Sequence, residues 1–208
     1  MKKFFLGAAL AVFAITGTYA QVDKGSPSVG AKGGVNISTF TGDDIGEKDT
    51  RTSFNAGLVF ELPVSERFSI QPEVLYSAQG YTILKVDQEN FADVDDNTEY
   101  QLDYIQVPVL AKIYLVDGLS VEAGPSFNFK VNEEIDRAPT EDGGDIDISN
   151  EDSNINDFEF GLAGGLSYKF NNGFFLSGRY SYGVTKLIKD SDADIHNSVW
   201  QFGLGFMF

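Results

Sequence analysis

Cysteine is absent from this chain of 208 residues, histidine occurs once, and basic residues number 15 against 31 acidic ones. Without cysteine the chain can form neither a disulfide scaffold nor a cysteine-bound zinc site, and one histidine is too few for a histidine-built metal site. The shortage of basic residues argues against binding nucleic acid, whose phosphates need a basic surface. We therefore expect no cofactor, no metal site and no nucleic-acid partner.

Long apolar runs are also missing. No uncharged apolar stretch reaches the ~18 residues that a membrane-spanning helix requires. Aromatic residues make up 13% of the chain and hydrophobic residues 42%, which is enough to bury the core of one domain. The formal net charge of -16 is typical of a soluble acidic protein, so the position of that charge along the chain becomes important.

The first residues have the layout of a secretory signal peptide. Lys2 and Lys3 precede an apolar stretch over 4–15, and small residues stand at Thr18 and Ala20, just before Gln21. We predict that residues 1–20 form a cleavable signal peptide and that residues 21–208 are exported. No cysteine follows the apolar stretch, which excludes a lipid anchor at the mature N-terminus.

The rest of the chain alternates with period two, as strands with two different faces do. At the C-terminal end, large apolar residues alternate with small or polar ones, from Trp200 and Gln201 to Met207 and Phe208. Eight segments share this pattern: 28–40, 51–62, 67–81, 99–116, 119–131, 157–170, 173–187 and 196–208.

The connections between these segments alternate strictly in length. Three are short, at 63–67, 117–118 and 171–173, and the last two contain Asp-Gly and Asn-Gly, which favour hairpin turns. Four are long and polar: 41–50, 82–98, 132–156 and 188–195. Short periplasmic turns, long outer loops and an even strand number are typical of transmembrane β-barrels. We predict an all-β fold, an eight-stranded antiparallel transmembrane β-barrel with four extracellular loops; a soluble exported β-sandwich is the alternative.

In such a barrel the large apolar face points to lipid and the glycine-rich face points inward, where eight strands leave little more room than side chains fill. The inward positions carry both signs of charge, and buried charges persist only when paired. We therefore predict a largely closed interior with a network of ion pairs formed by Lys32, Glu61, Glu73, Lys112, Glu122, Lys130, Glu159, Lys169 and Arg179.

The negative charge belongs to the loops. Residues 41–50, 82–99, 132–157 and 188–195 carry -3, -5, -9 and -2, together -19. The mature chain carries -18 after loss of two lysines with the signal peptide, so everything outside the loops nets +1. The acidity is therefore a property of one end of the predicted barrel.

Several motifs resemble a known family. They are VGAKGGVNIS at 29–38, QPEVLYSAQG at 71–80, DYIQVPVLAK at 103–112 and Gly124-Pro125. With them, residues 28–208 resemble the outer-membrane β-barrel domain family of Bacteroidota, of the porin-family or PorT-like type. The resemblance implies the cell outer membrane as location, with lipid and lipopolysaccharide around the barrel. One relative, PorT, is implicated in type IX secretion, although the long acidic third loop departs from a minimal barrel.

The last residues also resemble the signal that the bacterial barrel assembly machinery reads. The match consists of Gln201, Gly203, Phe206 and Phe208. This resemblance implies the assembly machinery as a partner during biogenesis, and it places both phenylalanines on the lipid face of the closing strand.

Three candidate chemistries are weaker. The acidic stretches 93–99 and 142–149 invite a calcium site, but neither has the glycine and glutamate positions of an EF-hand loop. His196 and Ser198 share one face of a strand, as the pair of a membrane lipid A deacylase does, but no acidic partner can be assigned. Gly-Gly pairs lack the strand-loop-helix context of a phosphate site.

We therefore predict a non-enzymatic outer-membrane barrel of structural or interaction type, with a largely closed interior. Its acidic loops would meet an unidentified extracellular protein or polysaccharide. A narrow porin for small solutes is the alternative, followed by a component linked to protein secretion or a lipid-modifying barrel enzyme.

Overall fold

A computed structural model describes residues 26–42, 49–83, 98–136, 146–148, 153–189 and 195–208. The predicted signal peptide (1–20) and much of the predicted long loops lie outside these residues. The strands are β1 (Ser28–Gly42), β2 (Asp49–Ser65), β3 (Phe68–Ile83), β4 (Thr98–Tyr114), β5 (Leu119–Asp136), β6 (Ile146–Asp147), β7 (Phe158–Lys169), β8 (Phe174–Gly183) and β9 (Ile195–Met207). In the described part of the chain, no helix is long and apolar enough to cross a membrane.

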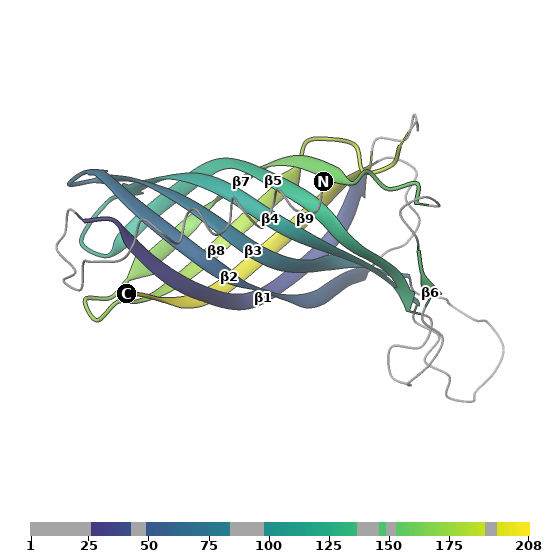
Figure 1. Ribbon diagram of the computed structural model, residues 1–208, viewed down its shortest axis with the longest axis horizontal. Helices are drawn as coiled ribbons and strands as arrows, with labels where there is room; N and C mark the ends of the chain where they lie inside the picture. The colour runs from purple at the N-terminus through teal and green to yellow at the C-terminus, as the bar shows by residue number, and fades with distance from the viewer. Residues whose placement is uncertain (1–25, 43–48, 84–97, 137–145, 149–152, 190–194) are drawn as a thin grey trace, which may run out of the picture.

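The strands close into a barrel (Figure 1). Each long strand pairs antiparallel with its neighbours in the order β1, β2, β3, β4, β5, β7, β8, β9. The barrel closes where β1 pairs with β9, from Gly30 opposite Met207 to Gly42 opposite Ile195. Among the described residues, the two-residue β6 pairs with β5 alone, at the end of the barrel where the long connections lie. The predicted eight-stranded antiparallel barrel is confirmed.

Two strand ends differ from the prediction by more than three residues. β5 continues to Asp136 rather than ending at 131, because its acidic outer part still pairs with β4, as Ile135 does with Tyr100. β8 ends at Gly183 rather than 187, because the amides of Val184 and Thr185 both donate to the carbonyl oxygen of Phe160 instead of continuing the ladder. The polar composition of residues 132–136 predicted a loop, whereas their pairing with β4 makes them part of β5.

Inward-facing glycines mark places where neighbouring backbones crowd together. A Cβ added at Gly57 would lie 2.0 Å from the carbonyl oxygen of Val74, and one at Gly124 would lie 2.1 Å from that of Val109. No side chain fits at such a distance, so these strands can approach only through glycine. The narrowness expected of the barrel thus also appears as close contact between adjacent strands.

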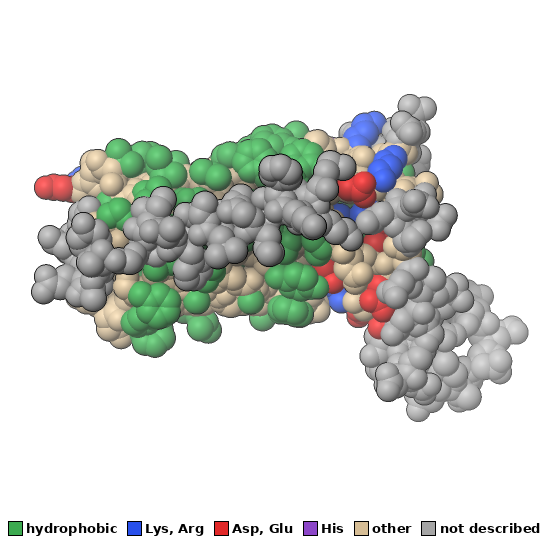
Figure 2. Space-filling model, viewed as in Figure 1, with side chains coloured by type: hydrophobic (Ala, Val, Ile, Leu, Met, Phe, Trp, Pro, Cys, Tyr) green, Lys and Arg blue, Asp and Glu red, His purple; other side chains and the backbone are tan. Residues whose placement is uncertain are grey.

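The outer wall is apolar and the inner face is polar. Leu204 and Phe208 are 61% and 65% exposed, whereas Gln201 on the same strand is 1% exposed. Figure 2 shows hydrophobic side chains along the visible wall, while charged side chains gather mostly at the end with the long connections. This inverted polarity, on a sheet closed on itself, rules out the soluble β-sandwich and suits a lipid environment.

Candidate functional site: the polar interior of the barrel

The interior contains buried polar side chains from every long strand. Several belong to the predicted charges, and others are amides and hydroxyls. Those that are at most 5% exposed include Lys32, Asn36, Asn55, Glu61, Gln71, Glu73, Gln106, Lys112, Ser120, Glu122, Ser126, Asn128, Glu159, Ser167, Arg179, Asn197 and Gln201. So dense a set of polar groups needs bonds inside the barrel, because unpaired polar groups are costly when buried.

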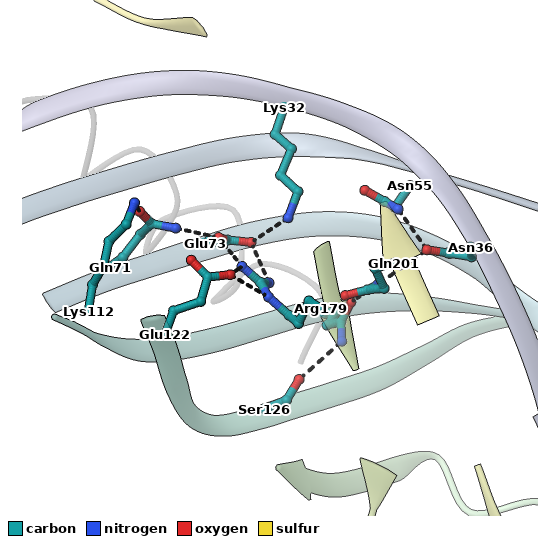
Figure 3. A network of polar contacts seen from close by, with 11 residues as sticks. Lys32, Asn36, Asn55, Gln71, Glu73, Lys112, Glu122, Ser126, Arg179 and Gln201 are labelled. Atoms are coloured by element: carbon teal, nitrogen blue, oxygen red, sulfur yellow. Dashed lines mark hydrogen bonds and ion pairs between the residues drawn. The ribbon is translucent and has the colours of Figure 1, made fainter. Parts of the chain in front are cut away.

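Arg179 on β8 is the centre of the ion-pair cluster (Figure 3). Its Nη1 and Nη2 donate to the two carboxylate oxygens of Glu73 at 2.9 and 2.7 Å. Its Nε and Nη2 donate to Oε1 of Glu122 at 3.0 and 2.7 Å. Lys32 Nζ lies 3.5 Å from Glu73. Two acids and two bases thus form a charge-balanced cluster, with the planar guanidinium bound in the two-point geometry that favours arginine over lysine.

The cluster continues toward the short-turn end. Gln71 donates to Glu73 at 2.7 Å and accepts a hydrogen bond from Lys112 Nζ at 2.8 Å, so an amide links this lysine to the cluster. Closer to the rim, Lys169 Nζ lies 2.8 Å from Glu61, which also accepts a hydrogen bond from the Tyr114 hydroxyl. The Lys169 side chain remains 29% exposed, so this pair is partly solvated.

A layer of neutral amides lies on the other side of the Arg179 cluster. Gln201 Nε2 donates to Oδ1 of Asn36 at 3.2 Å and to Oε1 of Gln106 at 3.0 Å. Asn55 Nδ2 donates to the same Asn36 oxygen at 2.6 Å, and Gln106 Nε2 donates to Ser126 at 3.2 Å. Sequence reasoning missed this layer because it followed only charged residues, although the period-two pattern already placed these amides on the inward face.

Three contacts cross the bore from one wall to the opposite wall. β8 and β3 are four strands apart in either direction around the barrel, and so are β7 and β2, and β9 and β4. Arg179 to Glu73, Lys169 to Glu61 and Gln201 to Gln106 join these three pairs of strands. Side chains therefore span the full width of the barrel at three levels.

The end with the long connections is filled differently. Phe40, Leu102 and Tyr104, at inward positions of β1 and β4, form an apolar cluster with Ile155 and Leu187 from the connecting segments; we call these five residues the apolar cap. Beside it, the predicted interior residue Lys130 bonds Glu133 and Ser153 at 2.6 Å each and lies 3.3 Å from Asp157.

The structure brings together some of the predicted interior charges and separates others. Lys32, Glu73, Glu122 and Arg179 form one cluster, with Lys112 attached through Gln71. Glu61 and Lys169 form a second pair, and Lys130 belongs to the opposite end. Glu159 departs from the expected pairing: in the described part of the chain, no lysine or arginine forms an ion pair with it, and Asn128 donates to it at 2.7 Å.

The residues of the predicted assembly signal divide between the two faces of β9. Phe206 and Phe208 face outward with their rings 5.3 Å apart, and the Phe208 amide donates to the Val29 carbonyl at 2.7 Å. Gln201 points inward, and a Cβ added at Gly203 would lie 2.7 Å from Cε of Lys32. Recognition of these residues by the assembly machinery stays a prediction.

The structure gives little support to the remaining candidate sites. Most of the acidic stretches 93–99 and 142–149 lie outside the described residues, among which no group of three or more His, Cys, Asp or Glu could hold a metal ion. Ser198 Oγ lies 3.2 Å from the hydroxyls of Thr41 and Tyr180. Its bonds are thus to hydroxyls, which do not accept a proton as a general base would.

The sequence profile of the family described as "Outer membrane protein beta-barrel domain" matches residues 19–189, well over half of the chain. The chain belongs to this family. Its location is therefore the outer membrane, with lipid around the barrel wall. The narrower Bacteroidota and PorT-like assignment stays a prediction.

Solved structures share the fold of this outer-membrane barrel. Neisserial surface protein A is 12% identical with a TM-score of 0.56, and the match covers 88% of this chain and 99% of that one. Ail, the attachment invasion locus protein of Yersinia pestis, is 14% identical with a TM-score of 0.52 and the same coverage, 88% and 99%. At such identities the likeness concerns the fold alone. No curated protein matches the sequence.

Proposed function

We propose that the protein is a non-conducting outer-membrane barrel of structural or interaction type. Residues 1–20 direct export and are removed, the barrel spans the membrane, and the four acidic loops face the exterior. There they meet an extracellular protein or polysaccharide. The protein is not an enzyme.

The main support for a closed interior is the ion pair between Arg179 and Glu73 across the bore. The two residues come from opposite walls, and Glu122 and Lys32 bind the same pair from two further strands. A hydrated ion entering from the short-turn end would have to displace four paired charges that are at most 5% exposed. An eight-stranded barrel has no spare width around such a cluster.

The proposed orientation follows from the connections. Short connections occur at one end and long ones at the other, and outer-membrane barrels keep their short turns on the periplasmic side. The segments 41–50, 82–99, 132–157 and 188–195, which include the outer ends of several strands, carry a net -19. A surface of this charge disfavours polyanions and favours basic protein surfaces, or polysaccharides bridged by divalent cations.

Single-channel conductance in planar bilayers tests the closed interior. The purified barrel should give no steady ion current. The double variant Arg179→Ala/Glu73→Ala removes the bond across the bore but leaves Lys32 and Glu122 as a balanced pair, so it should acquire a small steady conductance. Glu66→Gln, in an exposed turn, is the matched control and should stay silent. A steady current through the wild type would instead establish the narrow porin.

The interaction role needs a separate test. Replacing 137–145 with a short Gly-Ser linker removes acidic residues while retaining the contacts of Lys130 with Glu133 and Ser153. Proteins and polysaccharides bound to the surface of intact cells would be cross-linked and compared between the two forms. A partner captured by the full chain and lost with the linker supports the proposal, and an identical set of partners contradicts a role for this loop.

A further inference from the structure

Glu159 on β7 stands apart from the other buried glutamates of the barrel. It is 3% exposed, and its Oε1 accepts a hydrogen bond of 2.7 Å from Asn128 Nδ2. Glu61, Glu73 and Glu122 each form an ion pair with a lysine or arginine, whereas no such pair reaches Glu159 within the described ranges. A buried carboxylate without a compensating charge is strongly unfavourable, so Glu159 either takes up a proton or gains a positive partner.

Glu159 borders a cavity between the amide layer and the loop end of the barrel. Its volume is about 10 Å³, and Gln79, Asn128, Ser181 and Asn197 also line it. This is the space that one water-sized occupant needs. Three buried oxygens around it lack a hydrogen-bond partner: Oε2 of Glu159, Oγ of Ser181 and Oδ1 of Asn197. Unpartnered oxygens of this kind call for an occupant that can interact with all of them.

The chemistry of these oxygens selects the kind of occupant. Carboxylate, hydroxyl and amide oxygens are hard ligands, which suit cations without soft character. Calcium sites usually combine several carboxylates, whereas this cavity has only one, so a single positive charge matches it. We propose that the cavity binds one monovalent cation of about the size of sodium, held by Glu159, Ser181 and Asn197.

The position of the site favours retention of such an ion. Toward the short-turn end lies the Arg179 cluster, whose net charge is balanced, and toward the loops lies the apolar cap. His196 on β9, next in sequence to Asn197, is the competing source of positive charge. The site does not depend on whether the barrel conducts.

Cation-dependent thermal stability tests the site in the purified, detergent-solubilised barrel. Unfolding would be compared in sodium chloride and choline chloride at equal ionic strength and pH, because choline is too large for the cavity. Wild type should melt on the order of 5 °C higher in sodium, since a bound ion stabilises the folded state. Glu159→Gln should lose this difference, and Glu66→Gln should retain it. Equal melting of wild type in both salts, or a sodium effect that survives Glu159→Gln, overturns the proposal.

Two further variants keep the proposal testable if Glu159→Gln fails to fold. Asn197→Asp adds a second carboxylate, so calcium should raise its melting temperature but not that of wild type. His196→Gln should keep the sodium effect. A calcium response no larger than that of wild type in Asn197→Asp, or a sodium effect that disappears in His196→Gln, contradicts the site.

Discussion

The two ends of the bore are closed by different kinds of interaction. At the short-turn end, charged side chains from opposite walls bond directly, as Arg179 does with Glu73 and Lys169 with Glu61. At the loop end, the apolar cap joins β1 and β4 to residues of two connecting segments. The first closure belongs to the strands alone, whereas the second requires the connections. Variation in the loops should therefore change the outer end without opening the inner one.

Removing one partner from the Arg179 cluster should have the largest effect on stability. Arg179→Met would leave Glu73 and Glu122 buried with only Lys32 to balance them, and a broken buried ion pair costs about 3–5 kcal/mol. Urea unfolding, followed by the fluorescence of Trp200 on the outer wall, measures the free energy. Arg179→Met/Glu73→Gln should recover part of the loss because it removes one uncompensated carboxylate. A single variant as stable as wild type would show that the cluster contributes little.

Truncating the apolar cap should have the next largest effect, confined to the outer end. Leu102 is fully buried, so Leu102→Ala should lower the free energy of unfolding by about 2–5 kcal/mol. Hydrogen exchange should accelerate in the outer half of β4 while the amides around the Arg179 cluster stay protected. Leu204→Ala is the control, because Leu204 is 61% exposed on the outer wall. Equal acceleration along all of β4 would mean that the two ends unfold together.

Removing the ion pair between Lys169 and Glu61 near the rim should have the smallest effect. Lys169 is 29% exposed, and Glu61 keeps the hydrogen bond from Tyr114 when the lysine is removed. Lys169→Met should therefore lower the free energy of unfolding by about 1 kcal/mol, as partly solvated ion pairs do. High salt should shrink the loss, because it screens this pair but not the buried Arg179 cluster. A loss as large as that of Arg179→Met would place both pairs in the same environment.

The faces of the strands were predictable because alternation is a property of consecutive residues. The outward positions of Trp200, Phe202 and Leu204 follow from the sequence pattern, and so do the inward positions of Arg179 and Glu73. The outer part of β5 was missed because Glu133, Glu134 and Asp136 give it the composition of a loop. Its pairing with β4 overrides that local signal.

The partners of the buried charges were not predictable. Arg179 and Glu73 are 106 residues apart in sequence, and their contact depends on which strands lie opposite each other. Glu159 belonged to the same inward set, yet it borders an oxygen-lined cavity instead of a basic residue. No property of the neighbouring residues distinguishes these two outcomes.

The sequence by itself determined the strand number, the face of each strand, the asymmetry between short and long connections and the concentration of negative charge in the loops. All of these depend on short-range patterns and on composition. Only the tertiary structure decided which inward charges pair, where the bore is crossed and which buried glutamate has no basic partner among the described residues. Those outcomes depend on strand order and register around a closed barrel, which bring together residues about half the chain apart.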